Sequence, residues 1–191
     1  MTKKFAVIIS STRPSRVGPT IADWFVRSVA NTPDTQFELI DLRQINLPFL
    51  DEVHTARSGI YEKDHTKQWK ALIDRFDGYV FVTAEYNDGY PAPLKNAIDY
   101  LSAEWHNKPA MIVSYGWSGG AGASAQLHQV LTRLKMQVTG ISPALAFDGD
   151  TFDENDQLKD VDKSFADNVE EAKLATQQLV ALASTETAVL S

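Results

Sequence analysis

The sequence predicts a single α/β domain built on a doubly wound, five-stranded parallel sheet. Two observations predict it: short apolar runs recur along the chain, and patterns typical of helices alternate with them. A third is that the apolar runs are continuous and rich in β-branched residues, which is typical of strands buried on both faces of a parallel sheet. Five such units fit the strand order 2-1-3-4-5.

Strand and helix patterns follow one another in strict alternation. The strand patterns cover residues 5–9, 37–42, 78–83, 110–115 and 138–147. The helical patterns repeat apolar residues at helical spacing and cover residues 19–31, 67–76, 93–101, 123–136 and 161–183. One domain therefore spans residues 1–191. We expect its last segment, residues 184–191, to fray, because it has no apolar period.

One connection, residues 43–64, carries no clear element. Loops of this length inside a compact domain are usually functional or disordered. The apolar residues 47–50 offer it an anchor. We expect the segment to fold over a site or to lie at a subunit interface.

Composition excludes several classes of function. The formal net charge of −7 argues against a general nucleic-acid or anionic-membrane surface. The absence of cysteine excludes disulfides, thiolate nucleophiles and cysteine-ligated zinc. The apolar run after Met1 is too short for a secretion signal, and no stretch reaches the length of a membrane span. A cytoplasmic location is the expectation.

The turn after the first strand, residues 10–18, has the composition of an anion site. It combines hydroxyl groups with Arg13 and Arg16, and it leads directly into the first helix. Hydroxyls, backbone amides and arginine forks at a helix N-terminus bind phosphate well. The G-x-x-x-x-G-K-[ST] and G-x-G-x-x-G motifs are both missing, so a terminal monophosphate fits better than a triphosphate or a dinucleotide. The alternative is a capped turn with solvated arginines.

The turn after the third strand is suited to a flat ring with polar edges. Tyr86 and Tyr90 can pack on a planar heterocycle, and Asn87 offers both a donor and an acceptor. A glycine-rich turn, residues 116–122, follows the fourth strand and permits close approach of a ligand. In that turn Trp117 either stacks on a ring or fills an interface.

The sequence predicts no metal site. His54, His65, His106 and His128 include no pair with the spacing of metal ligands on one helix. The acidic residues between 148 and 156 lack the calcium-loop pattern and are expected to form a solvated turn.

Three motifs together resemble the NADPH-dependent FMN reductase family, whose members have the flavodoxin-like fold. They occupy residues 11–18, 85–99 and 113–120, and the likeness extends over roughly residues 4–140. The resemblance implies an enzyme that transfers hydride from NADPH or NADH through bound FMN to quinone, free flavin or a similar small acceptor. Residues 43–64 look most like the quinone-reductase branch of this family.

The resemblance also implies which residues bind FMN. The phosphate would contact Ser11, Arg13, Ser15 and Arg16. The isoalloxazine would be held by Glu85, Tyr86, Asn87 and Tyr90. The ribityl chain and one side of the ring would lie along Ser114, Gly116 and Gly119. No side chain is implied as a catalytic group, because the chemistry takes place on FMN.

Two positions depart from the pattern of the family. Ser10 stands where glycine is common, and Gly122 stands where many members have arginine. The second difference puts in doubt any contact that this arginine makes with a cofactor or a subunit. By resemblance the chain forms a homodimer or a dimer of dimers, with Trp105 and residues 93–103 as a candidate interface.

Two other functions stay open at this point. One is a flavodoxin-type electron carrier, whose redox partner is another protein. The other is a flavin-free regulatory protein of the same fold. The reductase interpretation requires the turns at residues 11–18 and 85–90 to face one crevice.

Overall fold

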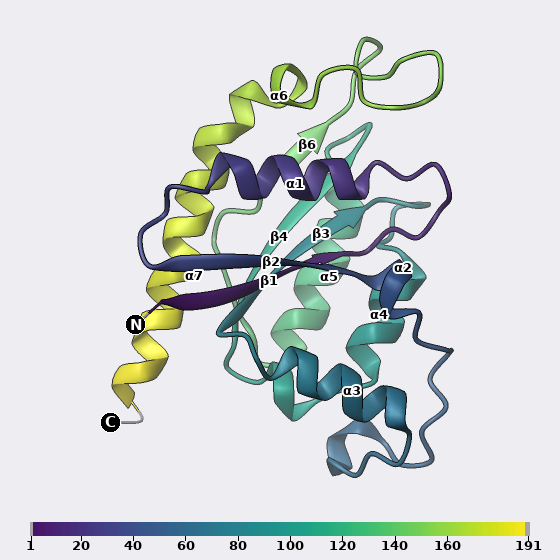
Figure 1. Cartoon of the computed structure of the whole chain (residues 1–191), viewed down its shortest axis with the longest axis vertical. Helices are drawn as coiled ribbons and strands as arrows, with labels where there is room; N and C mark the ends of the chain where they lie inside the picture. Colours follow the sequence, from purple (N-terminus) through teal and green to yellow (C-terminus); the bar gives the residue numbers. More distant parts are fainter. Residues whose placement is uncertain (1, 190–191) are drawn as a thin grey trace.

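The structure is a computed structural model that describes the backbone of residues 2–189 and the side chains of residues 2–185. It contains a parallel sheet in the order β2-β1-β3-β4-β5, with β6 also paired to β4 (Figure 1). The strands are β1 Lys3–Ile9, β2 Thr35–Asp41, β3 Gly78–Ala84, β4 Pro109–Gly116, β5 Gln137–Val138 and β6 Ala144–Ala146. The predicted flavodoxin-like fold and strand order are confirmed.

The helices alternate with the strands. They are α1 Gly18–Ser28, α2 Leu42–Ile45, α3 Asp64–Ile73, α4 Ala92–Asp99, α5 Ala121–Arg133, α6 Val161–Ser164 and α7 Val169–Val189. Short 3-10 turns are η1 Ala56–Ser58, η2 Ala103–Trp105 and η3 Ala166–Asn168. No helix within the described residues has both the length and the apolar character of a membrane span.

Alternate residues of each central strand face opposite layers of helices. On β1, Phe5, Val7 and Ile9 belong to the core beneath α1 and α7. Their neighbours Ala6 and Ile8 belong to the core beneath α3, α4 and α5. Because both faces are covered, the strand has to be apolar throughout, which is why its sequence shows no alternation.

The fifth strand position is divided between two short segments. The predicted strand over residues 138–147 is replaced by β5 and β6, which pair with β4 near its start and near its end. Gly140 and Pro143 lie in the interruption. Both residues weaken a continuous strand, and proline cannot donate to the ladder. β6 thus delivers Phe147 to the same edge of the sheet as the end of β4.

The segment 43–64 is ordered against α4. The amide of Asn96 donates to the Pro48 carbonyl at 2.7 Å and accepts from the Leu50 N–H at 3.0 Å. The Tyr100 hydroxyl lies 3.0 Å from Asp51 Oδ1, which His65 Nε2 also contacts at 2.8 Å. These contacts hold residues 43–64 against α4, the helix that the sequence suggested as a dimer face.

Trp105 corrects the expected interface. Its side chain is fully buried, and its ring N–H donates to the Ile98 carbonyl at 3.1 Å. The ring packs edge-on against Tyr79 in the core. Trp105 therefore belongs to the interior, and the expectation that it forms a subunit contact is wrong.

The long helix predicted over residues 161–183 is broken near its start. Helix α6 ends at Ser164, and the buried ring of Phe165 packs against Trp24 with 5.6 Å between ring centroids. Burial of this ring outweighs the continuity of the helix. The expected fraying of residues 184–191 stays a prediction: helix α7 runs to Val189, and residues 190–191 lie outside the described residues.

Candidate functional site

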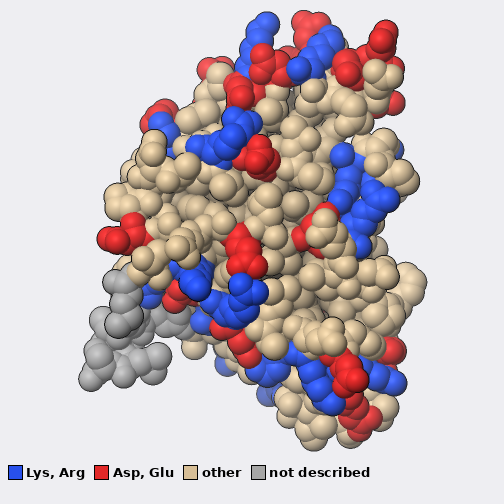
Figure 2. All heavy atoms as spheres, viewed as in Figure 1, with Lys and Arg blue, Asp and Glu red and all other residues tan. Residues whose placement is uncertain are grey.

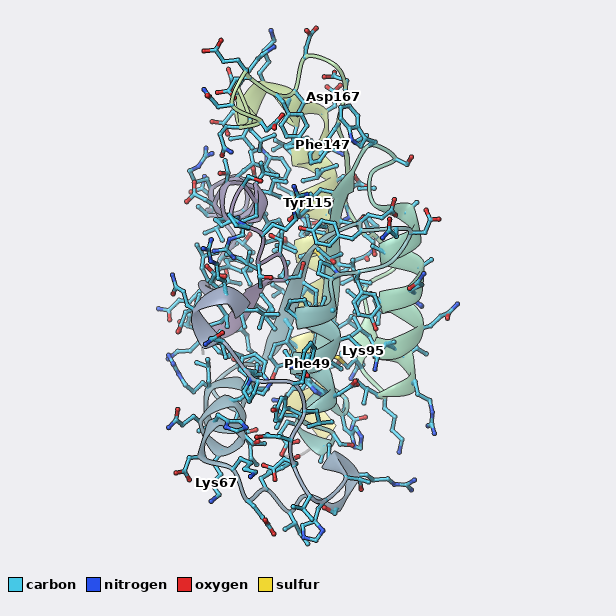
Figure 3. The ribbon with its side chains drawn as sticks, turned by 90° about the vertical axis from the view of Figure 1, so that its right-hand side faces the viewer. Phe49, Lys67, Lys95, Tyr115, Phe147 and Asp167 are labelled. Atoms are coloured by element: carbon cyan, nitrogen blue, oxygen red, sulfur yellow. The ribbon has the colours of Figure 1, made fainter. Side chains whose placement is uncertain are left out.

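A cavity of about 420 Å³ opens at the carboxyl ends of β1, β3 and β4. Figure 3 looks onto this end of the molecule, where Tyr115 and Phe147 lie next to one another. The cavity is bordered by the three turns that the sequence singled out and by the turn after β6. The expected site residues that line it are Arg13, Ser15, Arg16, Glu85, Tyr86 and Gly116.

The first two turns face one another across this cavity. The guanidinium carbon of Arg13 lies 5.8 Å from the centroid of the Tyr86 ring. Behind them, the Tyr115 hydroxyl at the end of β4 donates to Ser11 Oγ at 3.1 Å. Burial raises the pKa of Tyr115 well above its usual value, so this hydroxyl stays protonated as the donor. The crevice required by the reductase interpretation is therefore present.

The turn after β1 leaves polar groups available for an anion. In the first turn of α1, Pro19 has no backbone N–H and the Ile21 N–H donates to the Val17 carbonyl at 3.1 Å, so only the N–H groups of Gly18 and Thr20 have no partner within the described chain. Ser10 Oγ is buried and has no hydrogen-bond partner within the described chain. Arg13 and Ser15 are exposed at the cavity rim. This donor set fits a phosphate group.

The surface around this turn is basic although the chain as a whole is acidic. Figure 2 shows Lys and Arg side chains gathered at the right-hand edge of the molecule, where the turn after β1 emerges. Arg13 and Arg43 are both exposed in this part of the chain. An anionic ligand would be attracted to this edge.

Arg16 lies in the cavity wall, but its guanidinium is turned to protein groups. Its NH1 and NH2 atoms each lie 2.5 Å from an oxygen of Asp41, and NH1 also donates to the Ser11 carbonyl at 2.6 Å. Burial alone would raise the pKa of Asp41, but hydrogen bonds from Arg16 and the Arg43 backbone N–H outweigh it and lower that pKa. The hydrogen bond with Asp41 raises the pKa of Arg16 in turn. Asp41 was not identified from the sequence.

The turn after β3 is a tight type I′ turn. Tyr86 N–H donates to the Gly89 carbonyl at 2.8 Å, and Gly89 N–H donates to the Tyr86 carbonyl at 3.1 Å. Asn87 and Asp88 both have positive φ, as this turn requires and as these residue types tolerate. Asn87 is exposed at the tip and does not line the cavity.

Glu85 connects this turn to α5. Its carboxylate accepts from the Ala123 backbone N–H at 3.1 Å, in the first turn of that helix. The Gln126 amide adds a second link, donating to the Asp88 carbonyl at 2.9 Å. A Cβ atom on Gly122 would lie only 2.6 Å from the Asp88 carbonyl oxygen. The close approach of the two turns therefore accounts for glycine at this position.

The glycine-rich turn is shaped by buried contacts. Ser114 Oγ donates to the Gly119 carbonyl at 2.7 Å, and both residues are buried behind the cavity wall. Gly119 and Gly120 have positive φ, and a Cβ atom on Gly120 would lie 2.8 Å from the Tyr115 backbone nitrogen. Ser114 and Gly119 thus hold the turn in place, while Gly116 faces the cavity.

Tyr90 lies away from the cavity lining. It is partly buried against the core formed with α3, α4 and α5. Burial, helped by the charge of Asp99, raises the pKa of Tyr90 to about 12. Its ring therefore supports the turn from behind.

An aromatic wall closes the cavity on the side of β6. Trp117, Phe147 and Phe152 line it, with 6.2 Å between the first two ring centroids and 4.8 Å between the last two. Asp156 also reaches the cavity. From the sequence, Phe147 was expected to end the fifth strand and residues 148–156 to form a solvated acidic turn. Phe152 among these acidic residues was the signal that a part of the turn packs inward.

Within the described residues no group of His, Asp or Glu side chains is placed to hold a metal ion. The acidic turn instead makes local hydrogen bonds. Asp148 accepts from the Thr151 hydroxyl at 2.8 Å and from the Asp150 backbone N–H at 2.9 Å. These contacts fix the shape of the turn that carries Phe152.

Comparison with known proteins agrees with this geometry. Residues 3–150 match the family described as NADPH-dependent FMN reductase, and they contain all three turns. The chain belongs to this family. The match confirms the resemblance seen in the three motifs and extends it to Phe147 at the aromatic wall.

Named relatives cover most of the chain. It is 43% identical over 152 residues to an NAD(P)H-dependent FMN reductase of Schizosaccharomyces pombe, covering 78% of this chain and 76% of the relative. It is 29% identical over 168 residues to a quinone reductase of Pseudomonas putida, covering 84% and 87%. The solved structure of FerB, a flavoenzyme NAD(P)H:(acceptor) oxidoreductase from Paracoccus denitrificans, has a TM-score of 0.72 at 20% identity, covering 94% and 98%. That last likeness shows the fold alone.

Proposed function

We propose that the cavity binds FMN and that the chain is an NAD(P)H oxidoreductase, with quinone, free flavin or a similar small molecule as acceptor. The observation that carries the proposal is the meeting of the three turns around one cavity, at the switch point of a doubly wound sheet. Membership of the reductase family and the names of the relatives support the same activity.

The donor set matches the two ends of FMN. The unpaired N–H groups of Gly18 and Thr20 at the start of α1, with Ser15 and Arg13, are suited to the phosphate. Glu85, Tyr86 and Gly116 border the part of the cavity suited to the flat ring. FMN, when bound, supplies the hydride chemistry, and NADPH or NADH is the cosubstrate.

The proposed role of the side chains at this site is to bind and orient FMN. Arg13 lies over Tyr86 at the cavity rim, between the first two turns. The aromatic wall of Trp117, Phe147 and Phe152 borders the opposite side of the cavity.

Anaerobic mixing with NADPH or NADH tests the function. The purified protein should carry FMN, and its visible absorbance should bleach rapidly after mixing and return when quinone is added. A flavin that does not bleach would indicate a flavodoxin-type carrier. A colourless protein that takes up no added FMN would indicate a regulatory protein of the same fold. Steady-state turnover with a panel of acceptors then identifies the preferred one.

We also propose that the chain acts as a homodimer or a dimer of dimers in the cytoplasm. Phe49, Leu50, Val53 and Ile60 support self-association, because these large apolar side chains are exposed on the segment that covers α4. Figure 3 shows Phe49 at the surface on the side that faces the viewer. The cytoplasmic location is proposed because the reaction draws on a pool of reduced pyridine nucleotide.

A further inference from the structure

Arg16 and Asp41 form an ion pair that the binding of FMN does not by itself explain. Arg16 belongs to the turn after β1, and Asp41 is the last residue of β2, 25 positions further along the chain. Both nitrogens at the end of the guanidinium contact the carboxylate, one oxygen each, at 2.5 Å. This is the paired geometry in which arginine and carboxylate interact most strongly.

The pair is largely shielded from water. The side chains of Arg16 and Asp41 are only 10% and 11% exposed. Asp41 Oδ1 also accepts from the Arg43 backbone N–H at 3.0 Å and so fixes the start of α2. A pair held in this way loses little to side-chain motion or to screening by salt, unlike the exposed pairs on the surface.

The pair also fixes one peptide of the phosphate-binding turn. Arg16 NH1 donates to the Ser11 carbonyl at 2.6 Å. Because a trans peptide is planar, the N–H of Thr12 points in the direction opposite to that carbonyl. The Arg16 guanidinium therefore keeps the Thr12 N–H on the opposite side of this peptide, pointing away from the charge of Arg16. Three of the five N–H groups of Arg16 are engaged in these contacts.

We propose that Asp41 is a positioning residue for the FMN phosphate. It holds Arg16 against the Ser11 carbonyl, and Arg16 thereby acts mainly by shaping the turn, whereas Arg13 is the arginine available to the ligand. This inference rests on the proposed binding of FMN. It adds a residue from β2, outside the three turns, to the determinants of cofactor affinity.

The variant Asp41→Asn tests the proposal with two flavins. FMN carries the phosphate and riboflavin lacks it, so quenching of flavin fluorescence gives an affinity for each. We expect Asp41→Asn to weaken FMN binding about 10- to 100-fold, as loss of charged hydrogen bonds does, and to leave riboflavin affinity unchanged. The control is Asp23→Asn, which removes an exposed carboxylate paired with Arg27 on α1 and should change neither affinity.

A double-mutant cycle tests whether the two residues act together. If Asp41 works through Arg16, then Arg16→Gln and the double variant should each lose about as much FMN affinity as Asp41→Asn alone. Hydrogen exchange of the FMN-free protein gives a readout without cofactor. The backbone amides of residues 11–13, 15 and 16 should exchange faster in Asp41→Asn than in Asp23→Asn, and Pro14 has no N–H to follow.

The outcomes separate this inference from the proposed function. If the unchanged protein binds FMN and Asp41→Asn binds it equally well, the positioning role is wrong while the function stands. Equal losses for FMN and riboflavin would also overturn it, because a general loss of structure affects both flavins. If the unchanged protein binds neither flavin, the proposed function itself fails. Should Asp41→Asn not fold, Arg16→Lys replaces it, since lysine keeps the charge but not the paired contact.

Discussion

Gly18 shows how one residue decides the shape of the phosphate-binding turn. A Cβ atom at this position would lie 2.3 Å from Ser11 Oγ and 2.8 Å from the Tyr115 hydroxyl oxygen. These two atoms are joined by the buried hydrogen bond that connects the first turn to β4. Any side chain at position 18 has to displace one of these two atoms. The φ angle of Gly18 is not positive, so the need for glycine comes from this close approach alone.

We therefore expect Gly18→Ala to lower both stability and FMN affinity. Overpacking of this kind costs about 1–3 kcal/mol, and the displaced Ser11 belongs to the proposed binding turn. Thermal unfolding and flavin titration measure the two effects. Gly149→Ala is the matched control, because nothing lies within 4 Å of a Cβ atom there. Equal melting temperatures for the two variants would show that the turn adapts to the methyl group.

At the scale of elements, the turn after β3 and helix α5 act as one unit. Glu85 places a carboxylate at the N-terminus of α5, where the helix dipole and the open N–H groups favour negative charge. Gln126 reaches back from α5 to the Asp88 carbonyl. The turn that borders the cavity is thus held by a helix whose body packs in the core through Leu127 and Leu131.

Glu85→Ala should loosen this unit. Loss of a cap costs about 0.5–2 kcal/mol, and we expect a comparable loss of stability together with weaker flavin binding. Glu85→Gln should lose less stability and less flavin affinity, because glutamine keeps a hydrogen-bond acceptor without the charge. Urea unfolding and flavin fluorescence measure the effects, with Glu154→Gln in the exposed acidic turn as the control. Unchanged flavin affinity in Glu85→Ala would show that α5 does not hold the turn.

At the scale of the whole molecule, large apolar side chains are exposed on one segment, residues 49–60. Phe49 is 87% exposed and Val53 is 75% exposed, and both lie on a segment fixed to α4 by hydrogen bonds. Large apolar side chains held in place at the surface are typical of subunit interfaces. The segment lies on the other side of the molecule from α7 (Figure 1).

The double substitution Phe49→Ser and Val53→Ser should weaken self-association. Each buried apolar side chain contributes about 1.5–3 kcal/mol, so the dissociation constant should rise at least about tenfold per residue. Sedimentation velocity over a range of concentrations measures this. Leu174→Ser on α7 removes another exposed apolar side chain and should leave assembly unchanged. A monomeric unchanged protein would refute the proposed dimer.

Several sequence predictions depended on local pattern, and these agree with the structure best. The apolar run of residues 5–9 predicted a strand buried on both faces, and β1 is that strand. Predictions that depended on contacts with distant parts of the chain were less accurate. The aromatic residue Trp105 was read as a surface contact, and the predicted helix over 161–183 is interrupted at Phe165.

The amino-acid sequence by itself determined the alternation of strands and helices and the composition of the three turns, and this alternation fitted the strand order of a doubly wound fold. Hydrophobic period and turn chemistry carry that information because they act between near neighbours. Only the tertiary structure decided that Arg16 pairs with Asp41 while Arg13 lies over Tyr86, and that Phe147 and Phe152 close the cavity. Those pairings depend on the register and packing of elements distant in the chain, which no local pattern encodes.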